Sequence, residues 1–349
     1  MPPAAIHFLK EVWLQGLLRA AGAPDTPGAP GTPGTPGTPG AAGARPSVHI
    51  DKFSGWDLFA LIFGAVLVGL NTLLVLYAVY WRKYPPLRAK NIKLIVALYV
   101  PMTLWYFGTI GTNLNIRLLV FKDSCIVFAS WLRVLLGTFL YIHVHILRLY
   151  LYIRIFTKMK RITIWCYVVP TVIYLAIIFG FGIPTTVLKN SLSIEYLPVL
   201  GVCTYGTAFK EMTFAIIWLG WFGVLLATFL ARHINTSFNE FREMLAVTII
   251  SSVVIIYISV VHHIVNNYII FTWVRVTTTV LEHIASQSSL FILLGAPIYN
   301  CMFHHDEYKR RFYEKLHLEG MGFRYNLAME RMSVSTTVAA QPEAKVLPK

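Results

Sequence analysis

Five ionisable or amide side chains lie inside stretches of sequence that are otherwise apolar. They are Arg133, His262, Asn266, Glu282 and His283. A charged side chain at the centre of a bilayer costs roughly 3 kcal/mol or more, so such residues either form a functional site or pair with one another. We expect Glu282 to pair with Arg133 and the five residues to form a ligand-binding pocket. The alternative is an internal set of polar contacts that only holds helices together.

The depth of these residues in their helices supports a common site. Arg133 lies eight residues into its helix, about 12 Å along the axis at 1.5 Å per residue. Glu282 and His283 enter a later helix from the same side to a similar depth. His262 and its neighbour His263 point about 100° apart on a helix. Only one of these two histidines can therefore face a given site.

The composition of the chain predicts an all-α membrane protein. Of its 349 residues 56% are hydrophobic and only 13% are charged, whereas soluble domains carry about 25% charged residues. Long apolar runs without alternation favour helices over barrel strands. We expect a seven-transmembrane helix bundle with a short amphipathic helix after the last span. The expected spans are residues 56–81, 92–112, 125–153, 164–183, 212–231, 245–268 and 277–303.

The distribution of Lys and Arg predicts the orientation. One set of loops holds about twice as many basic residues as the other, and the basic side is cytoplasmic. We therefore expect a multi-pass plasma-membrane protein with its N-terminus outside and its C-terminus in the cytoplasm. The basic residues that give the net charge of +14 lie between apolar spans rather than on one soluble face, so we expect no nucleic-acid partner.

Three regions follow from this topology. Residues 1–55 form an extracellular low-complexity tail with repeated Gly-Thr-Pro triplets. Residues 56–303 form the seven-helix transmembrane domain. Residues 304–349 form a cytoplasmic amphipathic helix, in which Tyr308, Phe312 and Leu316 recur every four residues, followed by a disordered tail.

Two of the four cysteines fall on the outer side. Cys125 begins the third span and Cys203 lies in the loop between the fourth and fifth spans. Because disulfides persist in oxidising compartments, we expect a bridge between them; two free thiols are the alternative. Cys301, at the cytoplasmic end of the last span, fits a lipidation site, and an unmodified thiol fits equally well.

Seven spans, an outer cysteine pair and a short surface helix together form the layout of a G-protein-coupled receptor. Residues 84–91 (YPPLRAKN) and 235–243 (NTSFNEFRE) resemble the fungal-type seven-transmembrane G-protein-coupled receptor-like family, related to receptors with a C-terminal regulator-of-G-protein-signalling domain. The resemblance implies action on a heterotrimeric G protein. A regulator domain needs on the order of a hundred residues, so we expect residues 304–349 to lack it.

The inner side holds the candidate partner-binding residues. The third span ends without an acidic-Arg-Tyr triplet, and the seventh lacks Asn-Pro-x-x-Tyr. Arg148 and Tyr299 are the candidate analogous switches, and anchoring at the inner interface is the alternative. Phe238 and Phe241 form a candidate docking patch, for which a solvated turn is the alternative.

We therefore expect a receptor-like protein, not an enzyme, that binds an unknown small-molecule or peptide ligand and needs no cofactor. A transporter or channel is the first alternative, although the sequence shows no internal repeat of the kind common in secondary transporters. A seven-helix metal hydrolase is the second. It needs several ligands converging on one metal, and no His-x-x-x-His or His-Glu-x-x-His motif occurs, so we expect no metal site.

Overall fold

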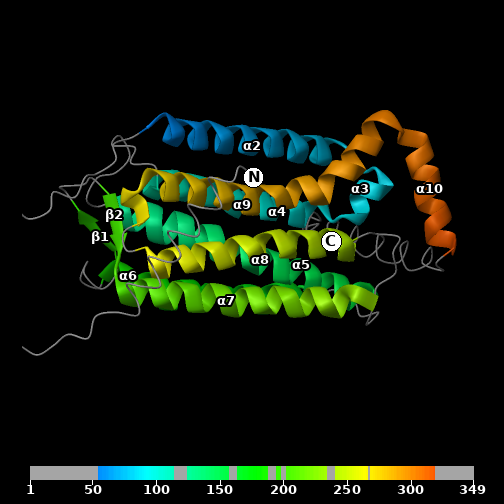
Figure 1. Cartoon of the computed structure of the whole chain (residues 1–349). Coiled ribbons are helices and arrows are strands. Elements are labelled where there is room, and N and C mark those ends of the chain that lie inside the picture. The colour runs from blue at the N-terminus through cyan, green and yellow to red at the C-terminus, as the bar shows by residue number, and fades with distance from the viewer. Residues whose placement is uncertain are drawn as a thin grey trace, which may run out of the picture.

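A computed structural model describes residues 54–113, 124–156, 163–187, 194–197, 202–233, 240–265 and 268–318. Long helices lie side by side in a bundle, with a small β-hairpin at one end and a helix lying across the other (Figure 1). In chain order the elements are α2 (Gly55–Tyr80), α3 (Pro85–Ala89), α4 (Ile92–Asn113), η1 (Ile126–Phe139), α5 (Leu140–Phe156), α6 (Trp165–Val187), β1 (Ile194–Leu197), β2 (Val202–Tyr205), α7 (Thr207–Leu230), η2 (Ala231–His233), α8 (Glu240–Ile264), η4 (Tyr268–Ile270), α9 (Thr272–Phe303) and α10 (His305–Leu318).

The expected class, an all-α membrane protein, is confirmed. Among the described residues six helices are long and apolar enough to cross a membrane, with η1 and α5 joined into one span. They match the first six expected segments to within about five residues at each end. Two segments lie outside the described part of the chain: residues 1–53, which belong to the expected N-terminal tail, and residues 319–349.

The seventh expected segment forms α9, which has 32 residues but is not among those six apolar helices. Its polar side chains are turned inward: Thr278, Thr279, Glu282 and Gln287 are each at most 2% exposed. These residues lower the mean hydropathy of α9, although its packed neighbours, rather than lipid, surround them. The sequence-based count of seven spans stays a prediction.

The third span lies at the centre of the bundle. In its apolar window 72% of the residues are buried, against 22% in the windows of α2 and of α7. η1 packs on α4, α6 and α7, while α9 contacts α2, α4 and α8. Gly108 permits the close packing of α4 on η1, because a Cβ there would lie 2.6 Å from the Cα atom of Arg133. A larger residue at position 108 would push the two helices apart.

The two ends of the bundle differ, and we name them by what they carry. The hairpin end carries β1 and β2, which pair antiparallel with Tyr196 opposite Cys203. The α10 end carries α3 and α10, which contact each other and α9. α10 is amphipathic as expected: Phe312 is buried, and ion pairs such as Arg310–Glu314 lie on its exposed side.

Local backbone geometry departs from the sequence-based expectation in the third span. The span is helical as expected, but η1 is a π-helix of 14 residues rather than an α-helix. Its wider turns allow the Thr138 hydroxyl to donate to the carbonyl of Arg133, five residues earlier, at 2.9 Å. π-Helical turns are frequent at functional sites, and this one carries Arg133.

Candidate functional site

A buried ion pair lies at the centre of the candidate site. The Arg133 guanidinium of η1 contacts the Glu282 carboxylate of α9, as the sequence predicted, and the two residues are 6% and 2% exposed. The second oxygen of Glu282 accepts a hydrogen bond from the Thr109 hydroxyl at 2.8 Å. A buried charge is tolerated only when it is paired and hydrogen-bonded, and both charges meet this condition.

Further hydrogen bonds join the ion pair to the hairpin end. Arg133 Nη1 donates to the Tyr205 hydroxyl of β2 at 2.8 Å and to Asn113 Oδ1 of α4 at 3.0 Å. The Tyr268 hydroxyl of η4 donates to the same Asn113 oxygen at 3.1 Å. Side chains from η1, α4, α9, β2 and η4 thus form one polar network. Asn113, Tyr205 and Tyr268 were not predicted as site residues, although polar side chains at the ends of apolar segments were a signal that could have indicated them.

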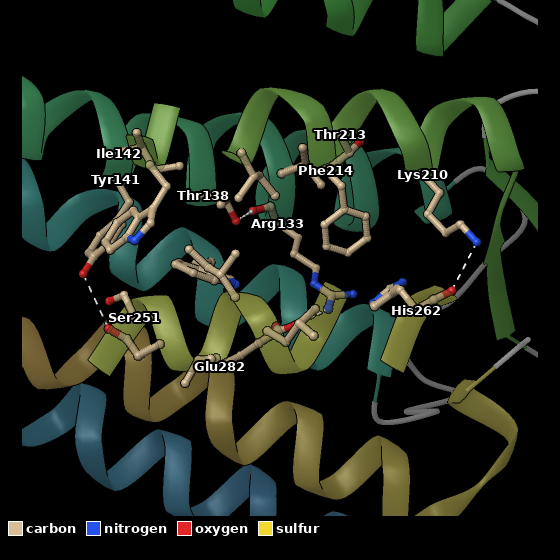
Figure 2. Close-up of a pocket in the computed structure, with 18 of the residues that line it drawn as sticks. Arg133, Thr138, Tyr141, Ile142, Lys210, Thr213, Phe214, Ser251, His262 and Glu282 are labelled. Carbon is tan, nitrogen blue, oxygen red and sulfur yellow. Dashed lines mark hydrogen bonds and ion pairs between the residues drawn. The ribbon is translucent and has the colours of Figure 1, made fainter. Parts of the chain in front are cut away.

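A cavity opens beside this network (Figure 2). It contains about 800 Å³ of space not filled by atoms, including open space at its mouth. The residues that line it come from α4, η1, α5, β2, α7, α8 and α9: Trp105, Arg133, Val134, Thr138, Tyr141, Ile142, Tyr205, Phe209, Lys210, Thr213, Phe214, Ile217, Trp221, Ser251, Val254, Ile255, Ile258, His262, Glu282 and Ala285.

His262 and His263 separate as the helix geometry predicted. His262 lines the cavity, with its ring centroid 4.3 Å from that of Tyr268, while its backbone carbonyl accepts a hydrogen bond from Lys210 at 3.1 Å. His263 is exposed and its Nε2 lies 3.1 Å from Glu211. Lys210, which was not among the predicted ligand-binding residues, also lines the cavity and is therefore a residue of the site.

The structure does not bring the candidate ligand-binding residue His283 to this cavity. His283 is next to Glu282 in sequence but faces α2 and α4. Its ring packs on Tyr106 of α4, and it would lie 2.6 Å from a Cβ atom added at Gly64 of α2. Consecutive helical residues point about 100° apart, so Glu282 and His283 cannot both face the cavity. Asn266 lies outside the described residues.

The hairpin covers one end of the cavity and is tied down by a disulfide. Cys125 and Cys203 are bonded, which confirms the expected bridge. Tyr205, two residues after Cys203, stacks on Phe209 with ring centroids 5.9 Å apart. The bridge therefore holds a cavity-lining residue of β2 against the start of the third span.

Removing this bridge should loosen the hairpin. The disulfide closes a segment with a sequence separation of 78 residues, and a native disulfide contributes about 2–4 kcal/mol. Cys203→Ser should therefore lower the thermal unfolding midpoint in lipid nanodiscs by several degrees. Cys166→Ser, at a buried cysteine outside the bridge, is the control. Equal midpoints for Cys203→Ser and the unchanged protein would contradict a stabilising bridge.

At the α10 end, residues that flank α3 contact α10 and α8. The Tyr84 ring stacks on His305 with centroids 4.4 Å apart, and its hydroxyl donates to the His305 carbonyl at 2.8 Å. Burial raises the pKa of the Tyr84 phenol, which keeps this donor protonated. Lys90 forms an ion pair with Glu243 of α8 at 2.5 Å. Asn91 has a φ of 53°, which asparagine tolerates, and its carbonyl accepts from Leu94 in the first turn of α4.

Among the described residues, the candidate partner-binding and lipidation residues do not form one surface. Arg148 is buried in α5, whereas Tyr299 of α9 is 58% exposed and packs beside Phe303. Cys301 is buried at 4% exposure and accepts a hydrogen bond from Tyr77 at 3.7 Å. Its thiol is therefore not presented to an acylating enzyme in this conformation, so the lipidation site we expected is not accessible here. Phe241 is half-buried, and Phe238 lies outside the described residues.

Comparisons with known proteins do not place the chain. No family model matches it, and no curated protein does. Within the described residues no group of three or more His, Cys, Asp or Glu side chains is placed to hold a metal ion. The functional argument therefore rests on the cavity, the network beside it and the contacts at the α10 end.

Proposed function

We propose that this protein is a seven-transmembrane receptor of the plasma membrane, similar to the fungal-type family named above, that transmits ligand binding at the hairpin end to a heterotrimeric G protein at the α10 end. The observation that carries the proposal is the cavity beside the Arg133–Glu282 pair. It is bounded by helices of the third, fifth, sixth and seventh spans, so an occupant contacts the elements whose relative positions define the state of the bundle.

The proposal takes α9 as the seventh span. Thirty-two residues extend about 48 Å at 1.5 Å per residue, which exceeds a hydrocarbon core of about 30 Å. Polar residues inside a membrane helix normally face the bundle interior, as Glu282 and Gln287 do here. The low hydropathy of α9 is therefore compatible with a membrane-spanning helix packed among other helices.

The proposal also orients the chain with its hairpin end outside. The Cys125–Cys203 bridge lies at this end, and disulfides persist on the non-cytosolic side of a plasma membrane. The α10 end carries basic residues such as Arg82, Lys83 and Arg310, as expected for cytoplasmic loops. Both observations support the orientation predicted from the loop charges.

Helix α8 provides the physical link between the two ends. His262 near one end of α8 lines the cavity, and Glu243 near its other end pairs with Lys90. The side chains of Lys90 and Glu243 are only 7% and 14% exposed, so the contact is shielded from solvent. A ligand that shifts α8 relative to α4 would strain this pair, and two discrete packings of one helix are a common form of switch.

The direct test measures nucleotide exchange on purified heterotrimers by the protein in lipid nanodiscs. We expect the unchanged protein to stimulate exchange weakly without ligand. Glu243→Gln should raise this basal rate several-fold, because it weakens the contact that holds α8. The charge-reversed variant with Lys90→Glu and Glu243→Lys, which keeps an ion pair there, is the control and should restore the low rate.

An absence of nucleotide exchange would contradict the receptor function. Exchange that stays at the rate without receptor for every heterotrimer class, in both the unchanged protein and Glu243→Gln, would overturn the proposal. Solute flux through liposomes that contain the protein, observed alongside that result, would favour the transporter alternative.

A further inference from the structure

We propose that the cavity binds a single-chain amphiphile with a carboxylate head at the hairpin end and a hydrogen-bonding oxygen toward the far end of its chain. This inference rests on the proposed function, since it names the ligand class of the same site. It rests on the length of the cavity, its walls, the charge at its hairpin end and unpartnered polar atoms in its lining.

The cavity is elongated along α7. Lys210 lines it near the hairpin end and Trp221 lines it deeper in the bundle. These residues are eleven positions apart on one helix, which corresponds to about 16 Å at 1.5 Å per residue. In Figure 2, Lys210 and His262 lie at one side of the view, Tyr141 and Ser251 at the other, and Arg133 between them. An extended chain fits this outline better than a compact molecule.

The walls of the cavity are predominantly apolar. The apolar lining residues, which come from η1, α5, α7, α8 and α9, are Val134, Ile142, Phe209, Phe214, Ile217, Trp221, Val254, Ile255, Ile258 and Ala285. Removing apolar area from water is favourable by roughly 25 cal/mol per Å². A hydrocarbon chain gains from contact with these walls, whereas a polar chain such as an extended peptide would lose hydrogen bonds to water.

The charged residues that line the hairpin end of the cavity are two cations, Arg133 and Lys210, and one anion, Glu282. Arg133 and Glu282 neutralise each other, while Lys210 also lines the cavity. The Lys210 ammonium donates to the His262 carbonyl at 3.1 Å, and its nearest described carboxylate, Glu211, is 3.9 Å away and half exposed. An ammonium has three donors, so Lys210 can also donate to a ligand carboxylate.

Some polar atoms of the lining have no hydrogen-bond partner among the described residues. They include the Trp105 indole Nε1 and the Thr213 hydroxyl, which are both buried and unpaired, and both residues line the cavity. Leaving a buried polar group without a partner costs about 1–3 kcal/mol. The Trp105 ring packs edge-on against Tyr141 with centroids 5.6 Å apart, which places it toward the deep end. An oxygen on the ligand chain would satisfy the indole donor there.

The test measures binding of ω-hydroxydodecanoate to the full chain in lipid nanodiscs, by native mass spectrometry and by the shift in thermal unfolding midpoint. The corresponding diol replaces the carboxylate with a neutral hydroxyl, and dodecanoate lacks the far oxygen. Because a charge-assisted hydrogen bond exceeds a neutral one by about 1 kcal/mol or more, we expect the diol to bind about tenfold more weakly. We expect dodecanoate to lose several-fold. Nanodiscs without protein correct for partition into lipid.

Variants of the chain locate this binding. Lys210→Met should remove the preference for the carboxylate over the diol, and Lys210→Arg should retain it. Lys309→Met, the same charge change on exposed α10, should have no effect. Ile258→Trp should block all three probes by filling the cavity, whereas Ile256→Trp, at a 51% exposed position of the same helix, should not. Trp105→Phe should abolish the gain from the far hydroxyl.

The outcomes distinguish this inference from the proposed function. Equal binding of the acid and the diol, or binding that Lys210→Met and Ile258→Trp leave unchanged, would overturn the ligand class. Specific binding of ω-hydroxydodecanoate without any nucleotide exchange would support the ligand class and count against the receptor. Nucleotide exchange elicited by another compound, with no binding of ω-hydroxydodecanoate, would support the receptor and count against the ligand class.

Discussion

Glu282→Leu should lower the free energy of unfolding by about 3–5 kcal/mol, because it leaves a buried charge without its partner. The Arg133 guanidinium is 6% exposed, and its remaining described contacts are with uncharged groups such as Asn113 and Tyr205. Unfolding of the chain in lipid nanodiscs, followed by circular dichroism against denaturant, measures the change. Thr109→Val, which removes only one neutral donor to Glu282, is the matched control, with an expected loss of about 1 kcal/mol.

The double variant with Arg133→Met and Glu282→Leu separates folding from binding. Replacing both members of a buried pair with apolar residues is often neutral or stabilising, so most of the lost stability should return. Binding of ω-hydroxydodecanoate should not return, because both residues line the cavity. An unfolding midpoint for Glu282→Leu equal to that of the unchanged protein would show that the pair does not stabilise the bundle. A double variant that still binds would make the pair purely structural.

Asp57→Leu should have an effect of similar size, about 3–5 kcal/mol, through a second buried pair. Arg275 of α9 donates two hydrogen bonds to the Asp57 carboxylate of α2, at 2.7 and 2.6 Å, and both side chains are 0% exposed. Removing the carboxylate leaves the guanidinium in the interior, where the Ile269 carbonyl accepts a hydrogen bond from it at 2.7 Å. Unfolding in nanodiscs and the yield of folded protein in cells measure the loss.

For the Asp57–Arg275 pair, unlike the Arg133–Glu282 pair, we expect the double variant to keep probe binding. Neither Asp57 nor Arg275 lines the cavity, so the double variant with Asp57→Leu and Arg275→Met should recover stability and also retain probe binding. The contrast between the two double variants identifies which buried pair serves the cavity and which only joins α2 to α9. Loss of probe binding in a stable Asp57/Arg275 double variant would contradict this assignment.

Residues 84–91, one of the two segments that carry the family resemblance, make specific contacts in the structure. Tyr84 stacks on His305, Lys90 pairs with Glu243, and Asn91 adopts the left-handed conformation at the start of α4. The sequence showed these residues as a loop with basic charge. Their partners are more than 150 residues away along the chain, so no local pattern could have identified the contacts.

The partner of Arg133 could be predicted from the sequence because the spans offer few acidic residues. A buried charge must be paired, and Glu282 was the acidic residue at matching depth when depth is counted at 1.5 Å per residue. Asp57 and Arg275 were not recognised in the same way. Each lies within about a turn of the end of its helix, where a charge ordinarily faces water or lipid headgroups, so the sequence presented them as loop or interface charges.

The sequence by itself determined the first six apolar helices, the amphipathic α10 and the Cys125–Cys203 bridge, because apolar length and the placement of cysteines on one side are properties of the chain read along its length. Only the tertiary structure decided which way each helix faces. It turned Glu282 into the cavity and His283 toward Gly64, buried Cys301 beside Tyr77, and made Lys210 part of the site. The physical reason is that the rotation of a helix about its axis is set by close packing with its neighbours, and those neighbours are distant in sequence.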